Sequence, residues 1–235
     1  MKKTFKLFLL SSAVLLNGCS YDFTQLNPWA QRAPKNVCLT KPITKPKNKL
    51  VPPKTYAEFK QRTNLRKSYK VYKDKELLAQ ATPANTHIKV DVSEQRVKLF
   101  VEDKVALSSP CTTGAKHKFE PNTKIYRDKH TPLGKYKITE KIHDKRSTIF
   151  GKYYRGKHCV YKGDKRKYKG SKKGVRYEGA SLKNWMRLTS GGIGMHASKY
   201  VKRYPGTNGC IRLPSSVSKT IFKHVRKGTK VSVVN

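Results

Sequence analysis

Apolar and polar residues alternate with a period of two in three consecutive stretches near the middle of the chain. Short polar runs, which are typical of turns, separate the stretches at residues 93–95 and 102–104. Such alternation indicates half-buried strands, and the turns between them favour antiparallel neighbours. The sequence therefore predicts a β-meander over residues 86–107. Its apolar positions are Ile88, Val90 and Val92, then Val97, Leu99 and Val101, then Val105, Ala106 and Leu107.

The pattern continues toward the C-terminus with two further strands and one helix. Residues 136–139 alternate after the turn Pro132-Leu133-Gly134, and residues 230–234 form a final β-rich stretch. Between them, Val217, Ile221, Phe222 and Val225 recur at helical spacing, which predicts a helix over residues 215–226. The fold class expected is mainly β with a few helices.

The first residues have the layout of an export signal. A cationic start is followed by an apolar run over residues 7–16, which is too short to span a bilayer of ~30 Å. Leu16-Asn17-Gly18-Cys19 resembles a bacterial lipobox, which implies a signal peptide over residues 1–18 and a lipidated Cys19. An ordinary secretory signal with a chance cysteine is the alternative. Ser20, rather than Asp, follows the cysteine, so we expect a lipid anchor in the outer membrane, facing the periplasm.

Residues 19–84 are polar, basic and proline-rich, with a short helix indicated around residues 56–72. We interpret this segment as a tether between the membrane and a domain over residues 85–235. Two interpretations of the tether stay open. It either grips an anionic polymer of the cell wall or acts only as a solvated spacer.

The charge of the chain points to an anionic partner. The 53 Lys and Arg residues face 14 Asp and Glu, a net charge of +39, and removing residues 1–18 deletes three lysines and leaves +36. Nucleic acid, phosphorylated envelope polymers and acidic lipid all fit such a charge. Export makes nucleic acid an unexpected partner, so an anionic envelope polymer or lipid is expected.

Tyrosines are interleaved with cations between residues 152 and 173. Such a stretch could stack on bases or sugar rings. The alternative, which the composition favours, is a solvated loop over a binding groove.

The cysteines show no metal or redox motif. No C-x-x-C pair occurs, and no cluster with ligand spacing accompanies the cysteines, so no metal site and no cofactor are predicted. In an oxidising compartment, a disulfide among Cys38, Cys111 and Cys159 is compatible with the sequence, which does not place it.

Cys210 and His196 form the candidate for nucleophilic chemistry. A catalytic thiol needs a depressed pKa and a base within hydrogen-bond reach. Cys210 follows a Thr-Asn-Gly turn, and Arg212 shares its face if the segment is extended. Lys199, Lys202 and Arg203 lie in the preceding loop, and no Asp or Glu occurs after Glu178. This local field favours a thiolate, and His196 is the candidate base. The alternative is an inert, buried cysteine.

At these residues the chain resembles the YkuD-type L,D-transpeptidases, which cross-link peptidoglycan through a catalytic cysteine. The resemblance is carried by Met195-His196 and by Thr207-Asn208-Gly209-Cys210-Ile211-Arg212-Leu213, and more weakly by residues 88–95, 113–114 and 131–136. It covers roughly residues 85–235. One residue departs from the pattern, because the His usual before Gly-Cys is Asn208 here, which donates a neutral hydrogen bond but does not titrate.

The resemblance implies a β-sandwich or mixed sheet and a role for each residue of the motif. Cys210 would be the nucleophile and His196 the base, oriented by the carbonyl of Ala197 or Ser198. The N–H groups of Gly209 and Cys210 would hold the oxyanion, with Asn208 and Ser198 positioning the site. Arg212 would bind a carboxylate of the peptidoglycan stem peptide, or else be a structural cation.

Two other functions remain open at the sequence level. Water in place of the acceptor amine would make the protein an L,D-carboxypeptidase or a hydrolase. A non-catalytic, cationic wall-binding lipoprotein is the second alternative, which Asn208 and the charge favour and the retention of His196 and Cys210 opposes.

Overall fold

The computed structural model describes residues 51–120 and 124–235, and residues 51–235 form one compact unit. The expected signal peptide, the lipid-modified Cys19, Cys38 and the first part of the tether lie outside the described residues. No helix within the described ranges is long and apolar enough to cross a membrane.

The predicted β-meander is confirmed. It consists of β2 (Thr86–Asp91), β3 (Arg96–Val101) and β4 (Lys104–Pro110), paired antiparallel in sequence order. Each tight connection contains a residue in the left-handed region, Gln95 at φ 49° and Glu102 at φ 54°. The alternating apolar side chains of the three strands point into the core, as the period of two requires.

Three further strands complete this six-stranded sheet, here called sheet A. The predicted C-terminal strand is β13 (Lys230–Val234), which lies parallel to β2 and antiparallel to β7 (Gly134–Lys137). A short strand, β1 (Tyr72–Lys73), pairs with β4 at the other edge, so the strand order is β1-β4-β3-β2-β13-β7.

A second sheet of five strands, sheet B, carries most of the remaining chain. Its strand order is β12 (Ile211–Leu213), β11 (Gly194–Ala197), β10 (Val175–Arg187), β8 (Glu140–Arg155) and β9 (His158–Asp164). Only β11 and β12 pair in parallel. A separate two-stranded hairpin consists of β5 (Lys118–Glu120) and β6 (Ile125–Arg127).

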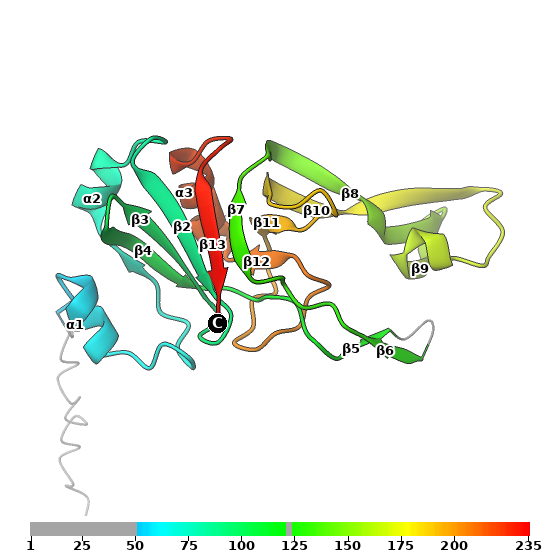
Figure 1. Cartoon of the computed structure of the whole chain (residues 1–235). Helices are drawn as coiled ribbons and strands as arrows, with labels where there is room; N and C mark the ends of the chain where they lie inside the picture. The colour runs from blue at the N-terminus through cyan, green and yellow to red at the C-terminus, as the bar shows by residue number, and fades with distance from the viewer. Residues whose placement is uncertain (1–50, 121–123) are drawn as a thin grey trace, which may run out of the picture. The chain divides into compact units, whose positions relative to one another are not determined.

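One hydrophobic core joins the two sheets and a helix. The predicted C-terminal helix is α3 (Ser215–His224), and it lies behind β13 in Figure 1. Its buried Val217 and Ile221 pack in the same cluster as Val90 of sheet A and Met195 of sheet B. The expected fold class, mainly β with a few helices and mixed sheets, is thus confirmed.

Residues 51–84, which the sequence analysis assigned to the tether, are folded onto the domain instead. They contain α1 (Tyr56–Gln61), β1 and α2 (Lys75–Gln80), and the expected helix is confined to the first six residues of its range. Phe59, Leu65 and Tyr72 form a small buried cluster. The buried guanidinium of Arg96 in β3 donates to the carbonyl of Lys70 at 2.9 Å and to that of Ser68 at 3.3 Å. These contacts anchor the segment to sheet A.

The Tyr- and Lys-rich stretch is also different from the loop that its composition favoured. Residues 152–173 include the end of β8, all of β9 and a 3₁₀ turn, η2 (Lys165–Lys167). Only the turn at residues 156–157 and the connection over residues 168–174 lie outside regular structure. The stretch is therefore an extension of sheet B rather than a loop.

Candidate active site

Strands β11 and β12 bring the two candidate catalytic residues near one another. Their parallel register sets His196 opposite Arg212 and Met195 opposite Ile211. Since Met195 and Ile211 point into the core, His196 and Arg212 point to the other face. Cys210 directly precedes β12, and its Sγ donates to the carbonyl of Gly192 at 3.7 Å. Arg212 lies close enough to lower the pKa of both the His196 imidazole and the Cys210 thiol, so these three residues of the sequence motif are near one another.

His196 is buried and held in one tautomer. Its side chain is 6% exposed, and its Nδ1 lies 2.8 Å from the carbonyl oxygen of Ala197, which only accepts hydrogen bonds. Nδ1 therefore donates, and the lone pair of Nε2 is left as the acceptor. Of the two carbonyls expected to orient the ring, Ala197 fills the role. Ser198 instead shapes the following turn, where its Oγ accepts from the N–H of Tyr200.

The protonation states of the pair differ from the thiolate that the sequence favoured. Burial lowers the pKa of His196 to about 4, so the imidazole is neutral at pH 7. Burial also raises the pKa of the Cys210 thiol, and this effect exceeds the opposing influence of the Gly194 N–H and of Arg212. The resting site is a thiol beside a neutral imidazole.

The neighbouring cations explain this difference. Lys199 and Lys202 are exposed, and water screens their charge. The Arg203 guanidinium turns away from the site and donates to the backbone carbonyls of Glu94, Gln95 and Leu65. Only Arg212 acts on the Cys210 thiol among the cations that the sequence placed around it.

Two threonines fix the turn that presents Cys210. Thr207 Oγ1 donates to the carbonyl of Cys210 at 2.5 Å and accepts from the N–H of Gly209 at 3.2 Å. Thr131 Oγ1 donates to the carbonyl of Gly209 at 2.8 Å and accepts from Gly114 N–H at 2.8 Å. Gly209 itself has φ +107°, which favours glycine. The N–H of Gly209, a predicted oxyanion donor, is thus already engaged.

A buried glutamine fixes the backbone segment that bonds to this turn. Gln95 donates through Nε2 to Thr113 Oγ1 at 2.7 Å and accepts the Thr113 N–H through Oε1 at 2.9 Å. The carbonyl of Thr113 accepts from the N–H groups of Gly206 and Thr207. The sequence analysis assigned no role to Gln95, Thr131 or Thr207.

Behind His196 lies a polar and aromatic support on β8 and β10. The Trp185 and His196 ring centroids are 6.3 Å apart, and Trp185 Nε1 donates to Glu140 at 2.7 Å. Lys145 and Arg187 both form ion pairs with the same Glu140 carboxylate at 3.1 Å. This set limits the movement of the imidazole on the side away from Ala197.

The two remaining residues of the motif differ in environment. Asn208 is exposed, and its side chain makes no hydrogen bond within the described ranges. The Arg212 side chain is half-buried, and no carboxylate among the described residues lies within 4.0 Å of it. Burial lowers the pKa of Arg212, which nevertheless stays charged at pH 7. Among residues 51–120 and 124–235, no carboxylate neutralises this cation.

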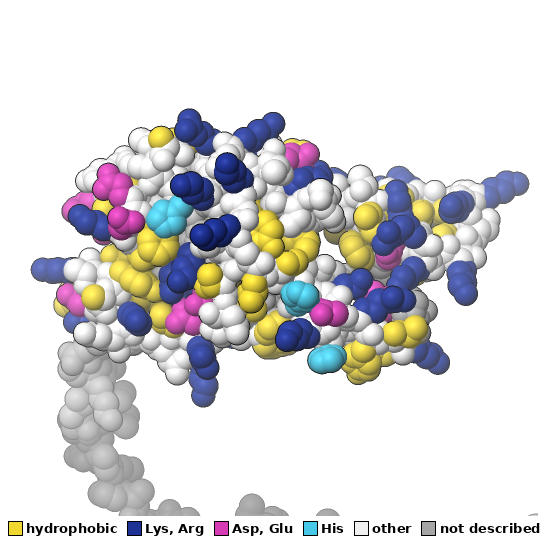
Figure 2. All heavy atoms as spheres, in the orientation of Figure 1, with side chains coloured by type: hydrophobic (Ala, Val, Ile, Leu, Met, Phe, Trp, Pro, Cys, Tyr) yellow, Lys and Arg dark blue, Asp and Glu magenta, His cyan; other side chains and the backbone are white. Residues whose placement is uncertain are grey.

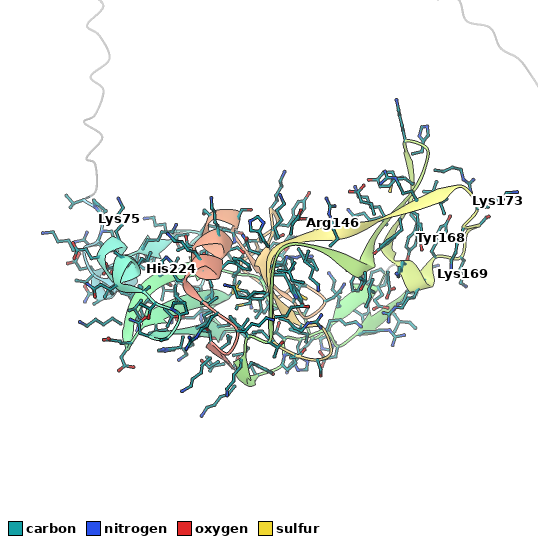
Figure 3. The ribbon with its side chains drawn as sticks, turned by 90° about the horizontal axis from the view of Figure 1, so that it is seen from above. Lys75, Arg146, Tyr168, Lys169, Lys173 and His224 are labelled. Carbon is teal, nitrogen blue, oxygen red and sulfur yellow. The ribbon has the colours of Figure 1, made fainter. Side chains whose placement is uncertain are left out.

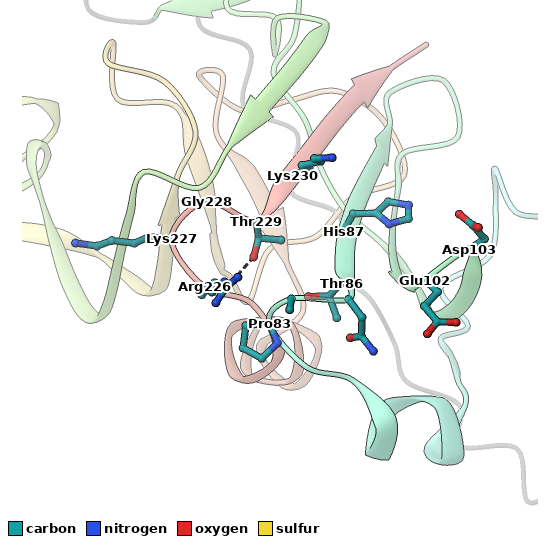
Figure 4. A pocket seen from close by; sticks show the side chains of 12 residues that line it. Pro83, Thr86, His87, Glu102, Asp103, Arg226, Lys227, Gly228, Thr229 and Lys230 are labelled. Atoms are coloured by element: carbon teal, nitrogen blue, oxygen red, sulfur yellow. Dashed lines mark hydrogen bonds between the residues drawn. The ribbon is translucent and has the colours of Figure 1, made fainter.

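A hollow elsewhere on the molecule contains none of these residues. Figure 4 shows it beside the first residues of β2 and β13, with Arg226 and Lys230 on one side and Glu102 and Asp103 on the other. Its charges are mixed, and its lining includes neither Cys210 nor His196. Across residues 51–120 and 124–235, no three His, Cys, Asp or Glu side chains cluster as a metal site would require.

The remaining cysteines are not part of the site. Cys111 is buried and Cys159 is exposed on β9, and both are free. A disulfide between these two is therefore absent. Any pairing with Cys38 lies outside the described residues.

From the neutral state of His196 we predict how the free energy of unfolding depends on pH. Its pKa of about 4 in the folded protein lies below the ordinary value of 6.5, so the unfolded chain binds the proton more readily and stability rises with pH between these values. Lowering the pH from 7 to 4.5 should cost about 2.5 kcal/mol through this group. We expect chemical denaturation at the two pH values to show this decrease in the free energy of unfolding. In His196→Gln the decrease should be smaller by the contribution of the histidine. An equal loss in both proteins would contradict a neutral, buried His196.

The chain was compared with known proteins. The YkuD family profile, described as the L,D-transpeptidase catalytic domain, matches residues 85–233. No curated protein sequence matches the chain. Similar solved structures include L,D-transpeptidases from Xylanimonas cellulosilytica (14% identity, TM-score 0.46), Mycobacterium smegmatis (15%, 0.44) and Enterococcus faecium (24%, 0.41). The similarity covers 63%, 64% and 63% of this chain and 60%, 59% and 49% of theirs, so the chain spans half to three fifths of those chains.

Proposed function

The chain belongs to the YkuD family of L,D-transpeptidase catalytic domains, and we propose from this that it transfers peptidoglycan stem peptides through a thioester on Cys210. The observation that carries the proposal is the pairing of β11 with β12. It sets a neutral His196, whose Nε2 is an acceptor, opposite Arg212, and Cys210 is two residues before Arg212 in the chain. A thiol and a fixed neutral base are the two groups that acyl transfer by cysteine needs.

The first half-reaction forms the thioester. Cys210 Sγ attacks the carbonyl of the third residue of a tetrapeptide stem while its proton passes to His196 Nε2. The negative charge that develops on the carbonyl oxygen needs backbone N–H donors, and the Cys210 N–H is the candidate that remains once Gly209 bonds to Thr207. The tetrahedral intermediate then collapses, the C–N bond breaks, and His196 returns the proton to the departing D-Ala amine.

The second half-reaction decides the product. An amine of a neighbouring stem attacks the thioester, His196 takes its proton, and the thiol of Cys210 is regenerated with a new peptide cross-link. If water attacks in place of the amine, the product is a shortened stem, as in a carboxypeptidase or hydrolase. The positive Arg212 would attract a stem carboxylate to this face, since no described carboxylate already neutralises it.

Muropeptide analysis tests this function. Purified protein is incubated with disaccharide-tetrapeptides, and the products are separated and identified by mass spectrometry. We expect cross-linked dimers and free D-Ala with the wild-type protein and neither with Cys210→Ala. Shortened stems without dimers would instead identify a carboxypeptidase. No change in the muropeptides, with the protein folded, would leave a wall-binding role and refute the enzymatic one.

We also propose that the protein is anchored by lipid at Cys19 and faces the periplasm from the outer membrane. The support is the sequence Leu16-Asn17-Gly18-Cys19 with Ser20 after it. We expect Cys19→Ser to move the protein from the membrane fraction to the soluble fraction. Replacing the neighbouring Ser20 with alanine should leave it membrane-bound. Membrane retention of Cys19→Ser would contradict the anchor.

A further inference from the structure

Sheet B has an extension that the catalytic residues do not use. Residues 144–180, here called the arm, comprise the outer parts of β8 and β10 together with β9 and η2. Figure 1 shows these strands continuing past sheet A. The arm contains thirteen Lys and Arg residues against three Asp and Glu. Figure 2 shows Lys and Arg side chains spread over the surface of this extension.

Tyrosine rings cover one face of the arm. Tyr177, Tyr153 and Tyr161 form a row across β10, β8 and β9, because each is the register partner of the next. The Tyr168 ring stacks on Tyr153 with centroids 4.5 Å apart. A Cβ at Gly151 would lie 2.8 Å from the Tyr177 ring and closer still to the carbonyl of Glu178, so glycine there leaves room for the cluster. These rings give the arm a small core of its own.

The opposite face is covered by cations around one aromatic ring. We call it the arm face, and it consists of Lys152, Tyr154, Lys162 and Arg176, which alternation places away from the tyrosine row. Lys152 Nζ lies 5.8 Å and the Arg176 guanidinium 5.4 Å from the Tyr154 centroid. Lys162 and Arg176 are exposed.

Cations outnumber carboxylates on this face. Lys152 pairs in register with Lys162 on β9, where like charges destabilise the sheet, and with Glu178 on β10. Glu178 also forms ion pairs with Arg146 at 3.3 Å and Arg176 at 3.6 Å, so one carboxylate is shared among several cations. Toward the tip, Lys169 and Lys173 extend into solvent in Figure 3. An anion on the arm face would offset this repulsion.

We propose that the arm face binds a linear, phosphate-bearing polymer. Lys162, Lys152 and Arg176 lie on three neighbouring strands, β9, β8 and β10, which are ~4.8 Å apart, so the cations form a row across the arm that suits a chain of repeating charges. Nine of the thirteen arm cations are lysines, which act on phosphate as point charges rather than by a bidentate geometry. Of the described large apolar side chains, the arm exposes only Phe150 and Val160, fewer than insertion into a membrane surface requires.

Two strands connect the arm face to the support of the catalytic histidine. β8 and β10 carry Glu140 and Trp185 at their other ends, where Trp185 packs against His196. Trp185 pairs with Ile142, ten residues along β8 from Lys152, so a polymer bound on the arm face would be held on the same sheet ~33 Å from this support. The inference does not depend on the proposed reaction, because it concerns binding alone.

Binding of fluorescently labelled inorganic polyphosphate, measured by anisotropy from 50 to 300 mM salt, tests the proposal. The test variant combines Lys152→Gln, Lys162→Gln and Arg176→Gln. We expect it to bind about one hundredfold more weakly at 50 mM salt, with the slope of log K against log salt smaller by about 2, since each lost phosphate contact removes ~0.7. The matched control removes three exposed lysines outside the arm, Lys60, Lys104 and Lys219, and should change affinity by less than about threefold.

The other outcomes overturn the proposal. Equal losses in the two triple variants would mean that net charge, not the arm face, determines binding. Unchanged polyphosphate binding with lost binding to phosphatidylglycerol vesicles would identify the face as a membrane contact. Near-ultraviolet circular dichroism of the tyrosine cluster checks that the arm is folded. Should the triple variant unfold, Lys162→Gln alone must reduce the salt slope by ~0.7, and an unchanged slope refutes the assignment.

Discussion

Replacing Cys210 with serine is expected to abolish acylation of the protein, at least about a thousandfold in rate. A hydroxyl needs a stronger base than a thiol does, because it is far less acidic. His196, with a pKa of about 4, is too weak a base to activate it. The probe is a carbapenem, whose strained β-lactam carbonyl replaces the stem carbonyl and leaves a stable thioester. Intact-protein mass spectrometry should show one adduct on the wild-type protein and none on Cys210→Ser.

The control for this prediction is the exposed thiol of the arm. Cys159 is accessible, so Cys159→Ser tests whether any free thiol would react. We expect this variant to be acylated at the wild-type rate. Cys111 offers no competing site, because complete burial raises the pKa of its thiol to about 12. An adduct that survives in Cys210→Ser and disappears in Cys159→Ser would refute the assignment of the nucleophile.

The sequence predicted those helices and strands that bury one face in the core, because burial of one face produces a regular spacing of apolar residues along the chain. Strands β2, β3 and β13 each bury alternate residues in one core, and α3 buries a stripe at helical spacing. Residues 51–84 lack such a pattern. Their packing depends on Phe59 and on the distant Arg96, a contact between separate parts of the chain that local composition does not reveal.

The arm escaped prediction for a related reason. Its buried face consists of tyrosines and glycines, and lysines and arginines are spread over the remaining positions, so no contrast between apolar and polar residues marks the strands. The row of Tyr153, Tyr161 and Tyr177 exists only once three strands are paired. A sequence search for tyrosines that alternate with glycines and cations could have indicated strands in place of a loop.

The sequence predicted the reacting groups of the site but not the residues that hold them in place. His196 and Cys210 lie within a local motif, whereas Thr131 is 78 residues from the Gly209 carbonyl that it binds. The direction of the Cys210 pKa was wrong because charge along the sequence does not show exposure. Lys199 and Lys202 are solvated, and burial of the thiol outweighs the single nearby Arg212.

His196→Ala is expected to slow acylation by about 10²- to 10⁴-fold, the usual range for loss of a general base. The effect should be large because the Cys210 thiol, with its raised pKa, is protonated at neutral pH and must lose its proton during attack. The carbapenem adduct provides the rate, measured by mass spectrometry at several times. A melting curve separates this effect from unfolding, since His196 also packs against Trp185.

Asn208→Ala is the matched control for His196, because it removes the side chain in which this chain departs from its family. Asn208 is exposed and bonded to no described residue, so we expect its acylation rate and melting temperature to stay within about threefold and a few degrees of wild type. An oxyanion donor would instead cost ~2.7–4 kcal/mol, a loss of at least about a hundredfold.

The pH dependence of the same rate identifies the base. If His196 acts with its pKa of about 4, acylation should remain constant down to about pH 5 and fall only below it. An unperturbed histidine would produce the fall near its ordinary pKa of ~6.5. In His196→Ala the remaining rate should increase steadily with pH, because only the ionised thiol of Cys210 then reacts. A wild-type rate in His196→Ala at neutral pH would mean that Cys210 is activated without a base, and the paired mechanism would be wrong.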